Sequence, residues 1–388
     1  MKNYDYIITG AGCAGLSLLV RLIKSGKFSN RRFLLIDKYA REHNDRTWCF
    51  WEEGNGFFED IVYKKWNRLW FHGESFSKNF DIAPYQYKMI RGVDFYDYCF
   101  KLISEQHNID IWQGNISSQC GRGNIVELTM DETVYQFSDA VLFTSIWDDD
   151  KIKADQKSAI YLLQHFKGWV IETPGDHFNA EEAVLMDFRV SQQFGTTFGY
   201  ILPLDSRRAL VEYTLFTGKL LAPEEYDRQL KNYLSTWLQL DEYIISAKEF
   251  GVIPMTTARF PWLADGIYHI GTAGGQTKAS SGYTFQFIQK QCKAITDRII
   301  NGTLSEKKPP FPTPARFRFY DNILLRVLSE KRLSGNIIFT KLFQNNDSSA
   351  IFSFLDNNSS LRQDVSIISS LPMRPFAKAA LEKLIGKF

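Results

Sequence analysis

The feature that most constrains the fold is a glycine-rich turn after a short apolar run at the start of the chain. Three glycines follow residues 6–9 at the spacing Gly10-x-Gly12-x-x-Gly15, and a helical pattern comes next. In such a turn Gly10 permits a sharp reversal, Gly12 lets the backbone approach a pyrophosphate, and Gly15 lets the helix lie close to the strand. The backbone amides and the helix dipole at the start of the helix then favour binding of a negatively charged phosphate.

A second apolar run, residues 33–36, ends in Asp37. This acid lies about 20 residues beyond the glycines, where it would accept hydrogen bonds from a ribose 2′-hydroxyl. Strand, glycines, helix and distal acid together predict a dinucleotide site, with an ordinary glycine turn as the alternative. The predicted site also includes Ala14 and Lys38.

Composition narrows the functional classes. A chain of 388 residues suits two closely joined domains. A formal charge of +2 without a long basic block gives no indication of nucleic-acid binding. The five cysteines are scattered without a CxxC pair, so we expect no metal site and no disulfide framework. The absence of a signal peptide and of a long apolar run predicts a cytoplasmic protein.

Two arginines are candidates for phosphate contacts. Arg46 opens the run Arg-Thr-Trp-Cys-Phe-Trp, which is either a hydrophobic plug or a loop facing a cofactor. Arg91 precedes a helix predicted over 93–106, where it would hold a phosphate or lie on the surface. The aromatic content of 15% fits either a bulky core or a large apolar pocket.

The pattern from residue 160 to 250 is mostly strand, and two acids interrupt it: Asp187 and Glu212. A buried carboxylate is costly unless it is paired or protonated. If these acids are buried and unpaired, their pKa values rise and they can deliver a proton. The alternative for each is an exposed or core-paired carboxylate.

A second glycine-rich loop, Gly271-Thr272-Ala273-Gly274-Gly275, precedes a helix predicted over 285–302. It is either a plain loop or a second place for an anionic cofactor group. Two such regions are typical of FAD in the large flavoprotein hydroxylase-like fold. We therefore predict an α/β, Rossmann-like FAD-binding fold with an antiparallel substrate sheet and a helical C-terminal part.

The predicted organisation has four parts. Residues 1–150 form the first FAD-binding part with inserted strands at 60–90, residues 151–250 the substrate sheet, residues 251–302 the second FAD-binding part, and residues 303–388 the helical region. An acidic loop at 148–150 is the expected crossover between domains. Residues 372–388 predict a basic amphipathic helix, which either contacts an anionic membrane surface or packs on the body.

The chain resembles bacterial lycopene cyclases nearly from end to end. The stretches that carry the resemblance are residues 5–17, 46–51, 185–189, 211–214, 251–256 and 271–275, with Lys278 and residues 282–285. Hydroxylase relatives begin the second loop with Gly-Asp, whereas this chain has Thr272. The chain departs from the family at Thr144-Ser145-Ile146, where cyclases commonly have Asp-Ser-Arg, and at Tyr213, where a second acid often follows Glu212.

The resemblance implies a lycopene β-cyclase, an isomerase of carotenoid biosynthesis that uses reduced FAD without net redox change and NAD(P)H only to reduce the flavin. It implies Glu212 as the acid, with Asp187 as the second candidate. Trp169, Tyr200 and Tyr283 would stabilise a carbocation. Lycopene as substrate implies peripheral association with the inner membrane. The alternatives are a redox FAD-dependent hydroxylase or prenyl-chain reductase, and a carotenoid-binding non-enzyme.

Overall fold

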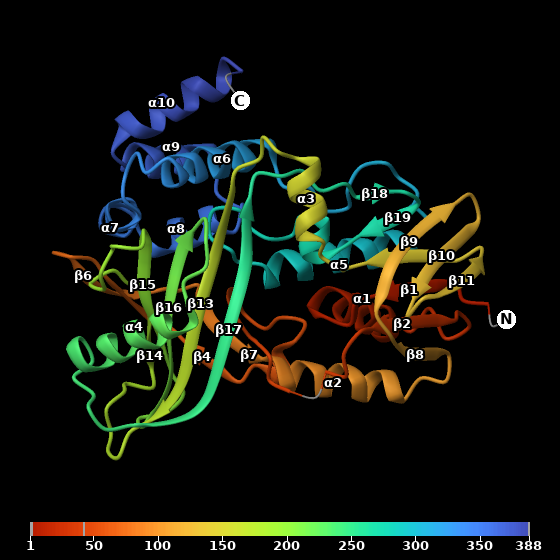
Figure 1. The fold of residues 1–388 in the computed structure, drawn as a ribbon, viewed down its shortest axis with the longest axis horizontal. Helices are drawn as coiled ribbons and strands as arrows, with labels where there is room; N and C mark the ends of the chain where they lie inside the picture. The colour runs from red at the N-terminus through yellow and green to blue at the C-terminus, as the bar shows by residue number, and fades with distance from the viewer. Residues whose placement is uncertain (1–2, 42, 387–388) are drawn as a thin grey trace.

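Two large sheets and a C-terminal layer of helices make up the computed structural model, which describes residues 3–41 and 43–386 (Figure 1). The N-terminal sheet and its helices lie at the right of Figure 1, the second sheet at the left, and the last helices across the top. This is the predicted α/β arrangement.

The first sheet has six strands in the order β18-β19-β12-β1-β2-β8. Their bounds are β1 Tyr6–Thr9, β2 Phe33–Asp37, β8 Ile109–Gln113, β12 Val141–Thr144, β18 Leu263–Ala264 and β19 Ile267–His269. All neighbours run parallel except β18 and β19. Because β19 joins β12 here, the second glycine loop returns to the sheet that carries the first.

Three helices pack with this sheet in one apolar cluster: α1 Cys13–Lys24, α2 Gly92–Ser104 and α5 Phe285–Ile300. In α1 the side chains Leu18, Leu19 and Leu22 are fully buried, at the spacing of one helical face. Gly15 has no room for a side chain, since a Cβ there would collide with the Gly10 carbonyl. The helix therefore lies as close to β1 as the glycine spacing predicts.

The second sheet has seven strands in the order β17-β13-β16-β15-β14-β5-β6. Their bounds are β5 Arg68–His72, β6 Ser77–Asp81, β13 Tyr161–Glu172, β14 Glu182–Asp187, β15 Thr196–Pro203, β16 Arg208–Thr217 and β17 Ile244–Thr256. The antiparallel prediction is confirmed except for the parallel pair β5–β14. The boundary expected at residue 250 falls inside β17, because this strand pairs with β13 over its whole length.

The two faces of this sheet have different partners. On one face the helix α4, Pro223–Thr236, packs against the sheet, with the Tyr233 ring over Gly199, where a Cβ would not fit. Since side chains alternate along a strand, β16 sends Val211, Tyr213 and Leu215 into this α4 cluster. The alternate residues Leu210, Glu212, Thr214 and Phe216 point to the opposite face.

Two small sheets complete the β structure. One contains β9 Ile116–Arg122, β10 Ile125–Met130 and β11 Thr133–Ser138, and the other contains β3 Thr47–Glu53, β4 Lys64–Trp66 and β7 Tyr85–Arg91. The inserted segment at 60–90 therefore supplies two strands to the second sheet and two to a small one. Strands were predicted there, but their partners were not.

The remaining helices are α3 Asp149–Asp155, α6 Ala315–Ser329, α7 Gly335–Asn345, α8 Ser348–Leu355, α9 Leu361–Ser369 and α10 Met373–Leu384, with one-turn helices η1 Glu59–Ile61 and η2 Gly271–Gly274. The acidic stretch expected as a loop thus begins α3, since acids at a helix start are favourable. Within the described residues, no helix is long and apolar enough to cross a membrane.

The predicted C-terminal helix is present as α10. Its residue Ala379 is buried against the body, whereas Met373, Leu381 and Leu384 are exposed, together with the adjoining Ile385. The predicted positions 387 and 388 lie outside the described residues. One side of the helix packs on the body, as one of the two expectations had it, and contact of its exposed apolar side with a membrane surface stays a prediction.

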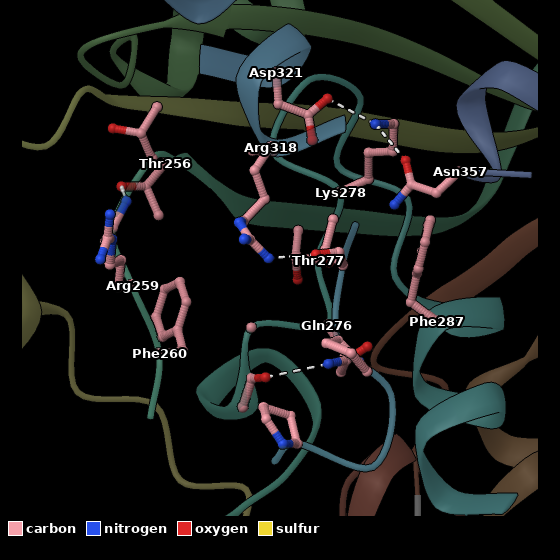
Figure 2. Close-up of a pocket in the computed structure, with 18 of the residues that line it drawn as sticks. Thr256, Arg259, Phe260, Gln276, Thr277, Lys278, Phe287, Arg318, Asp321 and Asn357 are labelled. Atoms are coloured by element: carbon pink, nitrogen blue, oxygen red, sulfur yellow. Dashed lines mark hydrogen bonds and ion pairs between the residues drawn. The ribbon is translucent and has the colours of Figure 1, made fainter. Parts of the chain in front are cut away.

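A buried ion pair ties the second glycine-rich loop to the C-terminal helices. The Lys278 Nζ donates to Asp321 Oδ1 at 2.6 Å and to Asn357 Oδ1 at 2.8 Å (Figure 2). Lys278 is only 4% exposed. The three residues come from the loop, from α6 and from the end of α8, so this contact joins segments that are distant in sequence.

We expect Lys278→Met to destabilise the protein by about 3–5 kcal/mol, because it leaves the Asp321 carboxylate buried without its cation. Thermal unfolding measures the change. The control is Lys293→Met, which breaks the exposed pair with Asp297 and should shift stability by no more than about 0.5 kcal/mol. Equal effects of the two substitutions would refute a stabilising role for the buried pair.

Candidate active site

A cavity of about 1000 Å³ lies between the first glycine turn and the second sheet. Its wall includes Gly10 and Gly12 of the turn, Glu212 of β16, and apolar side chains of α7 such as Phe339 and Phe343. A volume of this size accommodates a large ligand. The same cavity thus joins a dinucleotide-type turn to a deep, mostly apolar chamber.

The glycine turn leaves space where a phosphate-bearing group would lie. A Cβ on Gly12 would meet no atom within 4 Å, and no side chain caps the start of α1. The amides of the first helical turn are therefore available to an anion. Ser145 stands where the family pattern differs, and its hydroxyl donates to the carbonyls of Thr9 and Gly10. Ser145 thereby contacts the backbone of the turn.

The acid at the end of β2 lies at the rim of this cavity. Asp37 accepts hydrogen bonds from the Ala11 and Tyr39 amides and pairs with Arg41 at 3.1 Å. Its carboxylate is thereby held in one orientation beside the turn. Ala14 and Lys38 also line the cavity. The contact of Asp37 with a ribose stays a prediction.

The two candidate arginines are in different places. Arg46 lines the cavity and pairs with Asp45 at 3.1 Å. Arg91 is not among the described lining residues. It makes two hydrogen bonds to Asp94, of 2.6 and 2.7 Å, and lies over the Tyr63 ring. The structure therefore does not bring Arg91 to the predicted phosphate site.

The second glycine loop packs directly on the first turn. A Cβ on Gly271, whose φ is +63°, would come within 2.5 Å of the Ala14 Cβ. Thr272 lines the large cavity, whereas Gly274 and Gly275 line a second one of about 550 Å³. Figure 2 shows this second cavity between the loop and Arg318 of α6. The loop thus separates two chambers.

Glu212 is the buried acid of the large cavity. It is 7% exposed. Burial, followed by the nearby Glu249 carboxyl, holds the pKa of Glu212 well above its usual range. The neighbouring positions Thr214 and Phe216 line the same cavity, as strand alternation requires. Burial thus favours the protonated form of this carboxyl, and in that form it can act as an acid.

Sequence reasoning missed Glu249 and Gly168. In the sheet register, Gly168 of β13 lies opposite Glu212 of β16 on one side and opposite Glu249 of β17 on the other. A Cβ on Gly168 would be 3.0 Å from the Glu212 Cγ and 3.1 Å from the Glu249 Cγ. Nothing in the local sequence indicates a role for Glu249, because the register between neighbouring strands cannot be read from the sequence of one strand alone.

Three tyrosine hydroxyls form a network beside the acid. The Tyr87 hydroxyl is 2.6 Å from that of Tyr200 and 3.0 Å from that of Tyr283. Burial raises the pKa of all three phenols, so they are neutral. Tyr200 and Tyr283, both predicted from the sequence, line the cavity together with Tyr87. Their rings offer π faces to a cation.

Two residues that the sequence predicted for the site, Asp187 and Trp169, lie on the face of the second sheet that packs against α4, away from the cavity. Asp187 is paired with Gly199 of β15, whose open side faces Tyr233 of α4. Its carboxylate accepts from Arg189 at 2.8 and 2.5 Å and from the Tyr233 hydroxyl at 2.8 Å. Trp169, one residue after Gly168, is buried in the same α4 cluster. Neither lines the cavity, so both predictions are corrected.

The comparisons with known proteins agree with this geometry. A model of the lycopene cyclase protein family matches residues 5–381. No curated protein matches the chain significantly. Among solved structures, a geranylgeranyl bacteriochlorophyll reductase-like protein from Thermoplasma acidophilum aligns with a TM-score of 0.59 at 10% identity, covering 99% of this chain and 100% of that one.

Two halogenases align similarly. The flavin-dependent brominase Bmp2 gives a TM-score of 0.58 at 14% identity over the whole of both chains. The halogenase PltM, in complex with phloroglucinol and FAD, gives 0.59 at 11% identity, covering 99% of this chain and 96% of that one. The predicted fold class is therefore confirmed as the α/β fold of FAD-dependent monooxygenases and halogenases.

The arrangement around Asp187 predicts a role in stability. Asp187→Asn should destabilise the protein by about 1.5–3 kcal/mol, since it weakens the hydrogen bonds that the buried Asp187 carboxylate accepts from the partly exposed Arg189 and from Tyr233. The unfolding midpoint in guanidinium chloride reports this. Asp205→Asn is the matched control, because Asp205 pairs with Arg208 on the surface, and we expect it to change the midpoint little. An unchanged midpoint in Asp187→Asn would contradict the assignment.

Proposed function

The chain belongs to the lycopene cyclase family, and on that premise we propose that it closes β-ionone rings at the ψ ends of lycopene, giving γ-carotene and then β-carotene. A proton adds to the terminal double bond and leaves a tertiary cation. The next double bond attacks this cation, and loss of a proton restores an alkene. The reaction is an isomerisation without net redox change.

The observation that carries the proposal is the state of Glu212. Its carboxyl faces a large apolar cavity, and burial raises its pKa well above the usual range. Protonation of an alkene needs an acid that stays protonated and a site without competing water. After giving up its proton, the same carboxyl is a base in the same chamber. It can therefore accept the proton that ring closure releases.

Aromatic side chains support the cation. The rings of Tyr200 and Tyr283 lie on the cavity wall, and Trp51 packs edge-on against Tyr283 with centroids 4.4 Å apart. Their π faces are attractive to a positive charge in a dry site. Their neutral phenols are too weakly acidic to compete with Glu212 as proton donors.

The residues around the two glycine loops fit FAD. Gly12 offers an open cradle, the start of α1 has no capping side chain, and Gly10, Ala14, Asp37, Lys38, Arg46 and Thr272 line the cavity. These residues would hold the cofactor, with Gly271 and Gly15 allowing the loops to approach. Reduced FAD would supply negative charge near the cation. NAD(P)H would serve as its reductant.

The C-terminal helix supports contact with a lipid surface. Met373, Leu381 and Leu384 of α10 are exposed, with Lys378 and Lys383 on the same helix. Apolar side chains among lysines suit an anionic membrane interface. Since lycopene is a membrane solute, we place the enzyme at the cytoplasmic side of the inner membrane.

Filling the glycine cradle should abolish cofactor binding. Gly12→Val places a branched side chain in the open space where a phosphate would lie, and its φ of −86° suits valine. We expect FAD affinity to fall at least about 100-fold, about 3 kcal/mol, with an unchanged unfolding temperature. Titration by quenching of flavin fluorescence measures it. Gly175→Val, also in open space, is the control, and equal affinity in both variants would refute the cradle.

Removing the acid should abolish cyclisation. Anaerobic enzyme with dithionite-reduced FAD should convert lycopene to a cyclic product of unchanged mass, and Glu212→Gln should lower the rate at least about 1000-fold. Because the raised pKa belongs to the donor, activity should fall as pH rises through it. Product chromatography and mass spectrometry decide the outcome. A product changed by oxygen or hydrogen would favour the redox alternative, and pigment binding without conversion by the wild type would favour a carrier.

A further inference from the structure

We propose that Glu249 is a positioning residue for the acid: Glu212 and Glu249 share one proton across Gly168, and this pair keeps the donor protonated and oriented. The inference rests on the proposed function and deepens it. It also replaces Asp187 as the expected second acid. Three independent features of the second sheet support it.

The first feature is the register. Strands β16, β13 and β17 are neighbours, and the middle strand places Gly168 between the two acids. Since residues directly opposite each other share a face, both carboxyls leave the sheet on the cavity side. Any side chain at 168 would fill the space between their stems, where a Cβ would be 3.0 and 3.1 Å from the two Cγ atoms. Both acids line the same cavity.

The second feature is the hydrogen bonding of Glu249. The Thr47 hydroxyl donates to its Oε2 at 2.8 Å, so this oxygen acts as an acceptor. Its Oε1 is buried and has no hydrogen-bond partner. An unpartnered buried oxygen is costly. A proton on the facing Glu212 carboxyl is the donor that would satisfy it.

The third feature is the charge of the surroundings. Among the described residues, no lysine or arginine forms an ion pair within 4 Å of either carboxyl. The titratable groups that face the pair are the Cys49 thiol and the phenols of Tyr200 and Tyr283, and burial raises the pKa of each. These groups are neutral. The nearby Thr47 and Thr214 have uncharged hydroxyl groups, so they bring no positive charge to the pair. Without a cation, two negative charges cannot persist at this position, so one proton remains on the pair.

The proton count of the reaction fits this arrangement. The Glu212 O–H bond breaks as a C–H bond forms at the hydrogen-bearing carbon of the terminal double bond. The electron pair of that double bond makes the new bond and leaves the tertiary cation on the carbon that carries the two methyl groups. The two carboxylates then face the carbocation, which balances their charge. Ring closure moves the cation, a C–H bond beside it breaks to restore the alkene, and the proton returns to the pair. No outside acid, base or oxidant is consumed.

The test detects the protonated carboxyl directly and does not depend on catalytic activity. In FAD-loaded enzyme, infrared difference spectroscopy detects the carbonyl stretch that Glu212→Gln removes, and its pH midpoint is recorded. Glu249→Gln keeps the volume but removes the second charge, so the midpoint should fall by about one pH unit or more. Burial, the larger cause, should keep it above the value of a solvated glutamate. Glu249→Asp should restore part of the shift.

A second variant tests the role of Gly168. Gly168→Ala puts a methyl group between the two stems, so the midpoint should move in the same direction as in Glu249→Gln. Gly218→Ala, where a Cβ meets no atom within 4 Å, is the control and should leave it unchanged. If Gly168→Ala does not fold, Glu249→Gln decides alone. The basic limb of the pH–rate profile should shift by the same amount as the infrared midpoint.

The outcomes separate this inference from the proposed function. A merely structural Glu249 would lower activity equally at all pH values and leave the infrared midpoint in place, which would overturn the inference while cyclisation by the wild type stands. Conversely, a shifted midpoint in a protein that does not cyclise lycopene would keep the pair and refute the function. An unshifted midpoint in both Glu249→Gln and Gly168→Ala refutes the shared proton.

Discussion

A carboxyl that must stay protonated at neutral pH can do so only where water is scarce, and much of this structure serves that requirement. Glu212 lies in a cavity that is lined by one face of the seven-stranded sheet, by Tyr87 of β7, Tyr200 of β15 and Tyr283, and by α7. The buried pair of Lys278 and Asp321 fastens the second loop to the helical layer. The C-terminal helices are therefore part of the site's construction.

Strand alternation decides which acids of the second sheet point to the cavity. Asp187 and Glu212 look alike in the sequence, since each interrupts an apolar strand. One faces α4, where an arginine and a tyrosine hydroxyl donate to it, and the other faces the cavity, where no lysine or arginine of the described chain forms an ion pair with it. The first stabilises the protein and the second suits proton transfer. The two faces of one sheet thus place Asp187 in a packed interface and Glu212 at the cavity.

The sequence predicted the parts of this protein that depend on local pattern. Of the predicted site residues, Gly10, Gly12, Thr272, Glu212, Tyr200 and Tyr283 line one cavity, whereas Gly274 and Gly275 line the second one. Their roles stay predictions. Asp187 and Trp169 were misplaced because a strand pattern does not say which face meets the cofactor side. Glu249 and Gly168 were missed because their meaning arises only when three strands, distant along the chain, pair in one register. For the same reason, the strands that pair with β5 and β6 were not predicted.

The position of β17 has a consequence for how such an acid is adjusted. This strand is the edge of its sheet, so hydrogen bonds hold it on one side only, whereas β16 is enclosed between two neighbours. Glu212 therefore lies on an enclosed strand, and Glu249 lies on an edge strand, which is displaced more easily. If the two acids share a proton as proposed, substitutions at exposed positions of β17 that do not line the cavity, for example at Ile244, would adjust the strength of the acid without changing the cavity wall.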